Sequence, residues 1–482
     1  MKLNASLLLA GVLSASLVCA ENLTQKNVEK AQGIIEAAVE AYGGTEKLES
    51  INSVSIEHET EIVATGQSHK AAPPWDRNPA AGVDAIDIEN DVFVTKNHGT
   101  GSGFEFNNAT VINGEESYQL NYRAGTAAPI AEPDFNTTSG PFIRITPALL
   151  VRQLNDRAQT ARYMGEVESD GRTHEVVSFS MEVGPAISLY FDKETHQLHR
   201  SERVIPNFGL VEYRFTEYQP VNGIPFNKKF ELFLNGDENM VRKNVKTKVN
   251  ESFDALVKVD SSLERAAAVT PDPLSRQQID EGVYLIGGTG TYAMFVEMDD
   301  YIVAVGGTAG IPDRIEQLRE VVLDKPIKYG VMTHHHFDHV LGVPVYEAEG
   351  ATVVGATAHE TVIREAAEDG ESLKLKTVDD RFVIEDKNRR VEIIDIGPTA
   401  HTEHLLVAWL PEEGILFQAD HFTLPANGSL PPAVSSTKTF AGALIEHGLE
   451  PVKILAAHSP RVGTMKELQA AIEKEAVTVG SQ

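Results

Sequence analysis

Hydrophobic residues follow three different spacings along this chain. Over residues 28–48 they recur three or four positions apart, which predicts one amphipathic helix, and Gly43-Gly44 is a signal that ends such a helix. Over residues 53–250 hydrophobic and polar positions alternate between turn signals, which predicts antiparallel strands. Residues 126–141 lack this pattern and are expected to be irregular. We expect residues 21–251 to form a mainly antiparallel, half-barrel-like β domain with one helix.

The rest of the chain mixes strand and helix patterns. Residues 252–278 contain a run of alanines followed by two prolines, and they are expected to link two domains. From residue 279 onwards short apolar runs, such as 301–305, alternate with helical spacing, as over 312–322. This alternation predicts a layered α/β domain over residues 279–482. Two domains also fit the length of 482 residues, because a single hydrophobic core rarely grows that large.

The first twenty residues have the pattern of a secretory signal. Lys2 gives a positive start, residues 7–18 are apolar, and Val18 and Ala20 are the small residues that precede a cleavage site. The apolar stretch is short for a membrane span, and polar residues follow it at once. We expect residues 1–20 to be removed and the mature protein to be exported, either to a periplasm or out of the cell.

Cys19 is the only cysteine in the chain, and it lies inside this predicted signal. Its neighbours Ser16 and Val18 fit a lipid-attachment motif poorly, so a lipid anchor is the less favoured alternative. The mature chain would have no thiolate, and any metal site must use histidines and carboxylates. A net charge of −28 disfavours nucleic acid as a partner, and no later apolar run is long enough to cross a membrane. The sequence does not determine an oligomeric state.

Ten of the sixteen histidines lie within residues 334–458. The first of them open the motif His-His-His-Phe-Asp-His, which follows a predicted strand. Residues two apart in an extended segment project to the same side, so His334 and His336 can hold one cation together. Asp338 and His339 come next and offer a carboxylate and an imidazole to a second cation. Loops at strand ends are the usual place for such sites.

Three more candidate ligands each follow a predicted strand and complete the set. They are His401, after a Gly-Pro turn, Asp420 and His458. His335 lies inside the motif, but its alternating direction turns it away, so we expect a structural role. His359, His404 and His421 are expected to be packing or surface residues, with contact to a ligating imidazole as the alternative.

The seven candidate ligands together resemble the pattern of the metallo-β-lactamase superfamily, over roughly Gln278 to Ala476. The resemblance implies an αββα sandwich and two divalent metal ions, zinc first, with iron or manganese as alternatives. The implied ligands are His334, His336 and His401 for one ion, and Asp338, His339 and His458 for the other, with Asp420 bridging both. One departure is Val305-Gly306-Gly307, where the family commonly has an acidic residue, and this leaves the subfamily open.

Three phrases in the first half resemble those of periplasmic lipoprotein-carrier-like β domains. They are Ala41-Tyr42-Gly43-Gly44, Leu189-Tyr190-Phe191-Asp192 and residues 218–225, which read Tyr-Gln-Pro-Val-Asn-Gly-Ile-Pro. The resemblance implies a curved sheet around an apolar surface. Such a domain could present a lipid or substrate, or could simply shield the active-site face.

The ligand set points to hydrolysis of a small-molecule substrate. Two cations that share a water lower its pKa, so that a metal-bridging hydroxide is available at neutral pH. Asp338 is the expected catalytic residue, placed to orient this hydroxide and to pass its proton to the leaving group. The sequence lacks a Gly-x-Ser-x-Gly segment with a matching triad. We expect a carboxylic ester or lactone as substrate, with a thioester as a further option.

Three alternatives remain open at this stage. A β-lactamase is one, although true lactamases of the superfamily usually lack the bridging carboxylate seen here as Asp420. An iron-dependent enzyme similar to sulfur dioxygenases is another, because ligands that are all nitrogen and oxygen also suit iron. The third is a protein that binds a lipid or another small molecule in its β domain and uses its metals structurally.

Overall fold

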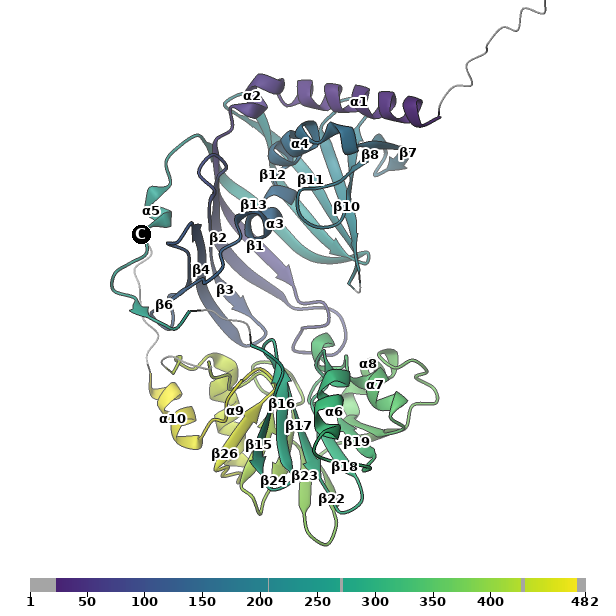
Figure 1. Ribbon diagram of the computed structural model, residues 1–482, viewed down its shortest axis with the longest axis vertical. Helices are drawn as coiled ribbons and strands as arrows, with labels where there is room; N and C mark the ends of the chain where they lie inside the picture. The colour runs from purple at the N-terminus through teal and green to yellow at the C-terminus, as the bar shows by residue number, and fades with distance from the viewer. Residues whose placement is uncertain (1–22, 207, 269–271, 426–429, 475–482) are drawn as a thin grey trace, which may run out of the picture.

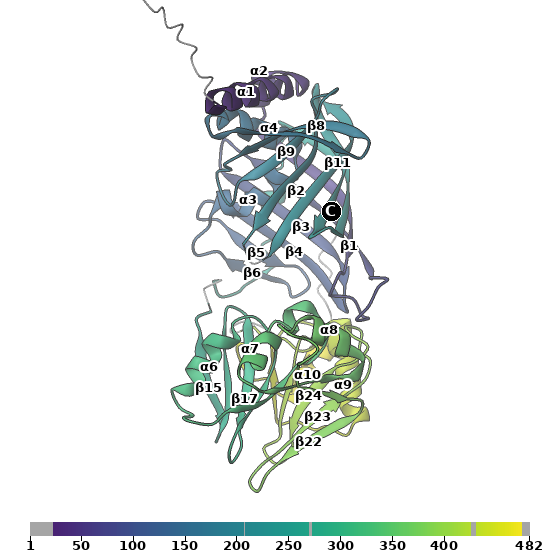
Figure 2. The same ribbon diagram turned by 90° about the vertical axis from the view of Figure 1, so that its right-hand side faces the viewer.

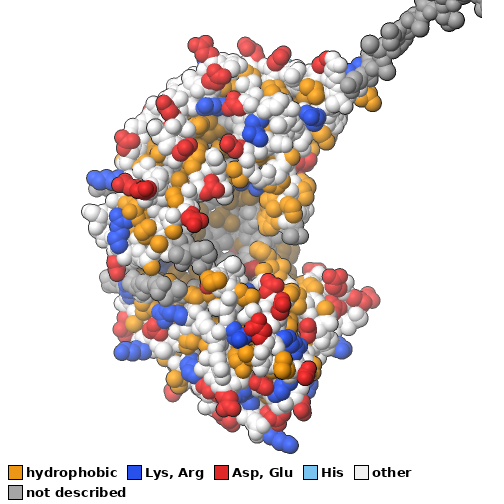
Figure 3. Space-filling model, viewed as in Figure 1, with side chains coloured by type: hydrophobic (Ala, Val, Ile, Leu, Met, Phe, Trp, Pro, Cys, Tyr) orange, Lys and Arg blue, Asp and Glu red, His pale blue; other side chains and the backbone are white. Residues whose placement is uncertain are grey.

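The computed structural model describes residues 23–206, 208–268, 272–425 and 430–474, which form two domains (Figure 1). The predicted signal, residues 1–20, lies outside the described residues, and export stays a prediction. Among the described residues, no helix is both long enough and apolar enough to cross a membrane. Figure 3 shows acidic side chains spread over both domains, and a hollow between the domains on one side of the molecule.

The N-terminal domain is built on one sheet of fourteen strands. The strands are β1 (Ser53–Val63), β2 (Arg77–Asp87), β3 (Val92–Gly101), β4 (Phe104–Asn113), β5 (Tyr118–Asn121), β6 (Thr126–Pro129), β7 (Arg162–Ser169), β8 (Arg172–Phe179), β9 (Ile187–Asp192), β10 (Leu198–Ile205), β11 (Gly209–Val221), β12 (Ile224–Leu234), β13 (Asp237–Val249) and β14 (Glu264–Arg265). Their order is β14-β6-β5-β4-β3-β2-β1-β13-β12-β11-β10-β9-β8-β7. The sheet curves around helices (Figures 1 and 2), and the predicted large antiparallel domain is confirmed.

The prediction of one helix in this domain is wrong, because four helices of the described residues pack on the sheet. They are α1 (Leu23–Ala41), α2 (Thr45–Glu49), α3 (Phe135–Arg144) and α4 (Pro147–Asp156). The first two cover the segment where one helix was expected, and they are separated by Gly43 and Gly44, both with positive φ. Residues from all four helices contribute to one apolar core with the sheet.

Strand β6 and helix α3 overturn the prediction that residues 126–141 are irregular, and α4 follows them directly. Asp134 caps α3, since its side chain accepts a hydrogen bond from the backbone of Thr137 at 2.9 Å. Pro147 stands in the first turn of α4, where a missing N–H costs nothing. Burial of Leu150 and Leu154 then holds α4 against the sheet, so packing outweighs the proline signals.

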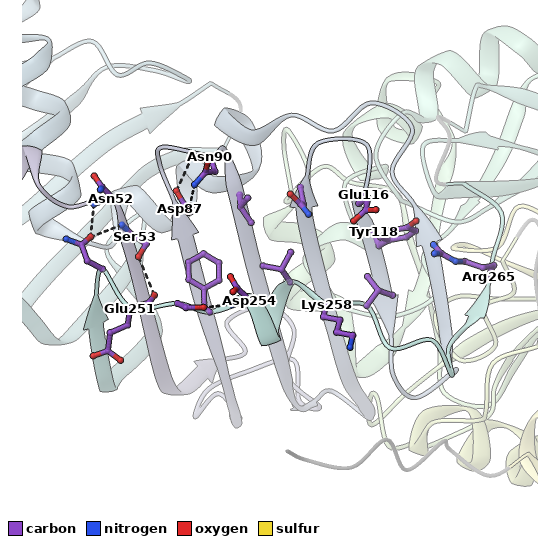
Figure 4. Close-up of a pocket in the computed structure, with 17 residues that line it drawn as sticks. Asn52, Ser53, Asp87, Asn90, Glu116, Tyr118, Glu251, Asp254, Lys258 and Arg265 are labelled. Atoms are coloured by element: carbon purple, nitrogen blue, oxygen red, sulfur yellow. Dashed lines mark hydrogen bonds between the residues drawn. The ribbon is translucent and has the colours of Figure 1, made fainter.

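The segment after β13 crosses the other face of the sheet. It contains α5 (Asp254–Val257), and Phe253, Leu256 and Leu263 pack into a small apolar cluster with the sheet. A pocket of about 820 Å³ lies beside it, and Figure 4 shows Asn52 and Lys258 among its polar lining. None of the lining residues is one of the seven candidate ligands.

Two of the three lipoprotein-carrier-like phrases meet in the fold. The hydroxyl of Tyr42 donates to that of Tyr218 at 3.2 Å, and the backbone N–H of Leu198 donates to the Tyr42 oxygen at 3.4 Å. Gly43 has φ +97°, and a Cβ there would lie 3.2 Å from the carbonyl oxygen of Gly223. These residues therefore serve the junction of α1 with the sheet, and a likeness to lipoprotein carriers stays a prediction.

The C-terminal domain contains two sheets, as expected. The first has the order β15 (Ser275–Asp280), β16 (Val283–Gly288), β17 (Thr291–Glu297), β18 (Ile302–Val305), β19 (Ile327–Val331), β20 (Thr352–Ala356) and β21 (Leu375–Val378). The second has the order β22 (Arg381–Glu385), β23 (Arg390–Asp395), β24 (Leu406–Leu410), β25 (Ile415–Gln418) and β26 (Lys453–Ala456). Strand β15 begins inside the segment expected to be a linker, because it pairs with β16.

Helices cover the outer faces of both sheets (Figure 1). They are α6 (Ile311–Arg319), α7 (Val343–Ala348) and α8 (Glu360–Glu365) on the first sheet, and α9 (Ser435–Glu446) and α10 (Met465–Glu473) on the second. The largest apolar core joins both sheets, and a second core lies between the first sheet and its helices. The αββα sandwich is confirmed, and the chain as a whole is mixed α/β.

Candidate metal centre

Four loops that follow strands carry the seven candidate ligands. The motif from His334 to His339 follows β19, and its last three residues form a 3-10 turn. His401 lies between β23 and β24, Asp420 follows β25, and His458 follows β26. Strands β25 and β26 run parallel, so the loops after them open at the same edge of the sheet.

The structure brings all seven side chains together in two groups. The first group is His334, His336, His401 and Asp420, and the second is Asp338, His339 and His458. In each group the candidate ligand atoms lie within 4.8 Å of one another. His334, His336, His339 and His401 are buried, and 11% of the Asp420 side chain is accessible. Asp338 and His458 are the more exposed ones, with 34% and 26% of their side chains accessible.

Asp420 joins the two groups. Its Oδ2 lies 3.0 Å from Nε2 of His401 and 3.0 Å from Nε2 of His339, which belong to different groups. Its Oδ1 lies 3.0 Å from Nε2 of His458. A single carboxylate therefore contacts imidazoles of both groups.

Burial and the surrounding imidazoles set the charge of the centre. Burial alone would raise the pKa of Asp420, but the contacts with His339, His334 and His401 outweigh it and hold this pKa well below its usual value. Burial would lower the pKa of His458, yet its hydrogen bond to Asp420 prevails and raises that pKa to about 9. A cation that binds His458 must displace this proton.

The direction of the imidazole hydrogen bonds fits a metal centre. A carbonyl oxygen can only accept, so the ring nitrogen facing it must carry the hydrogen. Nε2 of His336 faces the carbonyl of Ser68 at 2.9 Å, and its buried Nδ1 has no partner among the described residues. Nδ1 of His401 donates to the carbonyl of Ser102 at 2.6 Å. The neutral rings therefore keep their lone pairs for a cation, as metal-ligating histidines do.

Two contacts between imidazoles support the same conclusion. Nε2 of His401 lies 3.2 Å from Nε2 of His334, and Nε2 of His458 lies 3.2 Å from Nε2 of His339. Nδ1 of His458 donates to the carbonyl of Gly290 at 3.0 Å, which leaves its Nε2 without a hydrogen in the neutral ring. In the metal-free protein the raised pKa of His458 leaves a proton on the ring, and a bound cation would take the place of that proton.

His335, His359, His404 and His421 belong to neither group. His335 is buried and donates from Nε2 to the carbonyl of Ser68 at 2.9 Å, which agrees with the structural role expected for it. His359 and His421 are buried as well, and burial lowers the pKa of His359 to about 3. His404 is 40% exposed at its side chain and pairs with Asp395 at 2.7 Å.

The glycines at the end of β18 allow close packing around His339. A Cβ on Gly307 would lie 2.2 Å from the backbone oxygen of His339 and 2.5 Å from the sulfur of Met332. The sequence marked Val305-Gly306-Gly307 as a departure from the family. In the structure, Gly307 leaves room for the turn that carries the second group.

Residues of the N-terminal domain also contact the centre, and no sequence motif had indicated them. Nε2 of Gln67 donates to Oδ1 of Asp338 at 2.6 Å. The carbonyls of Ser68 and Ser102 accept from His336 and His401, as described above. These residues lie some 270 to 300 positions before their partners, and no local motif distinguishes them.

Comparison with known families places this centre in a recognised domain. Residues 302–464 match the family model described as Metallo-beta-lactamase superfamily. The C-terminal part of the chain is a metallo-β-lactamase superfamily domain with a histidine-rich metal site. None of the curated proteins matches this chain.

Several solved structures are similar to the chain. A metallo-β-lactamase from Pseudomonas aeruginosa in its mono-zinc form is 22% identical, and the likeness covers 42% of this chain and 94% of that one, with a TM-score of 0.34. A metallo-β-lactamase from Pontibacter korlensis is 17% identical, and the likeness covers 42% of this chain and 98% of that one, with a TM-score of 0.34. One from Hirschia baltica is 18% identical, and the likeness covers 41% of this chain and 96% of that one, with a TM-score of 0.32.

Proposed function

We propose that this chain is an exported hydrolase that binds two divalent metal ions, zinc first, and cleaves a carboxylic ester or lactone, or a thioester. The observation that carries the proposal is the contact of Asp420 with both ligand groups. A carboxylate shared in this way suits two ions placed side by side. Export rests on the first twenty residues of the sequence.

The two ligand groups indicate which residues would hold each ion. His334, His336 and His401 would hold one, Asp338, His339 and His458 would hold the other, and Asp420 would bridge them. When bound, the ions would supply an activated hydroxide at neutral pH and an electrophile for the oxygen that gains negative charge. The absence of cysteine from the ligand set is compatible with zinc, and also with iron or manganese.

Asp338 is the residue that we propose for proton transfer. Gln67 holds its Oδ1, while its Oδ2 lies 3.4 Å from Nε2 of His339 and 3.8 Å from Nε2 of His458. One carboxylate oxygen is therefore fixed and the other faces the ligand group. Because its side chain is 34% exposed, Asp338 can orient a water molecule, take up the proton that this water loses and pass it to a leaving group.

The choice of substrate rests on charge and on Asp420. The net charge of −28 repels polyanions, which disfavours phosphodiesters of nucleic acids. The bridging carboxylate is usually missing from true β-lactamases, as the family resemblance implies. These two arguments favour neutral carbonyl compounds such as esters and lactones.

A substrate panel tests the proposal. The mature protein, loaded with zinc, is assayed on lactones, aryl esters, thioesters, β-lactams and phosphodiesters, beside metal-free protein. Turnover of an ester or lactone is expected, and Asp338→Asn should lower kcat by about 100-fold or more, because it removes the proton carrier. Asp379→Asn, an exposed residue of the same domain, is the matched control and should keep full activity.

Each remaining outcome of this panel is informative. Hydrolysis of β-lactams alone would overturn the proposed substrate class. Activity of iron-loaded protein on a reduced sulfur compound, with none from zinc-loaded protein, would replace hydrolysis by oxidation. Lipid binding that survives in Asp338→Asn, without turnover by the parent protein, would favour a binding protein.

A further inference from the structure

Two loops of the N-terminal domain contact the metal-ligand residues directly. The β1–β2 loop (residues 64–76) reaches Asp338 through the side chain of Gln67 and reaches His336 through the carbonyl of Ser68. The β3–β4 turn (residues 101–104) reaches His401 through the carbonyl of Ser102. Each of the two ligand groups therefore has at least one member that is hydrogen-bonded to the N-terminal domain.

These contacts are of the kind that orients metal ligands. A hydrogen bond to the outer nitrogen of a ligating imidazole fixes its tautomer and the direction of its ring. Ser68 and Ser102 supply such acceptors at 2.9 Å and 2.6 Å. Gln67 does the same for a carboxylate, since its N–H group at 2.6 Å fixes Oδ1 of Asp338 and turns Oδ2 towards the ligand group.

The β1–β2 loop is held in place by its own hydrogen bonds. Ser68 is fully buried, and its hydroxyl accepts from the backbone N–H of Asp76 at 2.5 Å. The carboxylate of Asp76 accepts from the backbone N–H of His69 at 2.7 Å. The hydroxyl of Ser102 donates to the carbonyl of Gln67 at 2.5 Å, so the two loops are also tied to each other.

Backbone contacts dock the same loops on the C-terminal domain. The N–H of Phe337, between two ligands, donates to the carbonyl of Gly66 at 3.0 Å. The side chain of His69 donates to the carbonyl of Thr399 at 2.8 Å. Gly103 has φ +80°, and a Cβ there would lie 2.7 Å from the backbone of the residue before His401. The turn therefore fits against the His401 loop without room for a side chain.

We propose that the N-terminal domain completes the metal centre, with Gln67 as a positioning residue for Asp338 and the carbonyls of Ser68 and Ser102 as positioning groups for His336 and His401. This inference rests on the proposed two-ion centre and adds a role for the N-terminal domain. Gln67 would then influence the ion held by Asp338, His339 and His458. Ser68 would influence the ion held by the other group, which contains His336.

Metal affinity of full-length variants tests this assignment. Gln67→Met keeps the length of the side chain and removes the N–H donor, and Gln67→Glu keeps its shape but places a carboxylate against Asp338. Zinc binding is measured by competition with a chelator, and cobalt-loaded protein is followed by its visible spectrum. The dissociation constant of one ion should rise about tenfold in Gln67→Met and further in Gln67→Glu, as for other partners of metal ligands.

Two further variants separate positioning from general damage. Gln119→Met replaces an exposed glutamine on β5 of the same domain and should leave metal affinity and the cobalt spectrum unchanged. Ser68→Ala releases the loop from Asp76 and should weaken the ion of His336, so the part of the cobalt spectrum that changes should differ from that in Gln67→Met. Thermal unfolding of each metal-free variant checks that the fold is kept.

The outcomes distinguish the inference from the proposed function. If the parent protein binds two ions and Gln67→Met binds both equally tightly with the same spectrum, the N-terminal domain does not complete the centre, and the proposed hydrolase stands. If the parent protein binds no zinc and no cobalt, both proposals fail. A selective loss of one ion in Gln67→Met supports both.

Discussion

Asp420 is the side chain on which the two ligand groups depend. It is enclosed by imidazoles, with 11% of its side chain accessible, and its oxygens lie 3.0 Å from His339, His401 and His458. Burial of an isolated carboxylate is costly, so its negative charge has to be balanced by bound cations or by protonated imidazoles. In the metal-free protein the raised pKa of His458, about 9, supplies part of that balance.

Replacing Asp420 with Asn should therefore remove more than one ligand contact. The amide keeps the shape but carries no charge, and we expect at least one of two zinc ions to be lost on dialysis and activity to fall by about 100-fold or more. Elemental analysis of dialysed protein gives the stoichiometry, with Asp379→Asn as the control. Retention of two ions in Asp420→Asn would contradict a bridging role.

Gly307 supports a second prediction at the residue scale. Because a Cβ would meet the backbone oxygen of His339 at 2.2 Å, Gly307→Ala must displace the turn or the strand end. Overpacking of this kind costs about 1–3 kcal/mol, so the melting temperature should fall and zinc should bind more weakly. Gly442→Ala on α9, where nothing lies within 4 Å of the added Cβ, is the matched control and should not lower the melting temperature. Equal behaviour of the two variants would show that the space near His339 is not limiting.

The sequence could predict the seven candidate ligands, because residue type and spacing both carry their chemistry. It could not predict Gln67, Ser68 or Ser102. Two of these act through backbone carbonyls, which every residue has, and Gln67 gains its partner only when two domains dock. The distance of 271 residues between Gln67 and Asp338 leaves no local pattern to detect.

Strand β1 carries a buried histidine that links the stability of the sheet to pH. His58 lies between β2 and β13, with Nδ1 3.0 Å from the hydroxyl of Thr60 and Nε2 3.8 Å from Asp84. Burial lowers its pKa to about 4, Arg242 and His98 act in the same direction, and Asp84 opposes them. The folded sheet therefore keeps this imidazole neutral over a range in which the unfolded chain would bind a proton.

Stability should fall as the pH drops from about 6.5 to about 4, because the unfolded state takes up a proton that folded His58 refuses. Above about pH 6.5, the pKa of a histidine in the unfolded chain, this loss of stability is absent. At pH 4 the free energy of unfolding is lower by about 3 kcal/mol at most. Urea unfolding of the parent protein and of His58→Gln across this range measures it, and the variant should lose less free energy of unfolding. Parallel curves for the two proteins would contradict the assignment.

Helices α3 and α4 show what limits prediction at the scale of elements. The alternation of hydrophobic and polar residues predicted the strands well, because this pattern is visible within each strand alone. The helices are short, and Pro141 and Pro147 resemble breakers in the sequence. Only the sheet that wraps around them provides the apolar surface that makes them stable, and that sheet is assembled from strands far apart in the chain.

At the scale of the whole molecule, the two domains meet at the metal centre. The β1–β2 loop contacts the ligand motif through Gln67, Ser68 and Gly66, and the β3–β4 turn contacts the His401 loop. Ions that fix His336, His401 and Asp338 must also restrict the N-terminal groups bonded to them. Metal binding in one domain should therefore order part of the other.

Hydrogen exchange can detect this coupling. When zinc is added to metal-free protein, the backbone amides of both N-terminal loops, residues 64–76 and 101–104, should exchange more slowly. The amides of the ligand segments 334–339 and 399–403 should slow as well. The reason is that a ligand at 100 times its dissociation constant stabilises the folded state by about 2.7 kcal/mol. Strands β9 and β10, on the far side of the N-terminal sheet from these loops, serve as the internal reference and should change less. In Gln67→Met the gain of protection over residues 64–76 should shrink while that over residues 399–403 persists. Protection confined to the C-terminal domain in the parent protein would mean that the loops only rest against the centre and do not position its ligands.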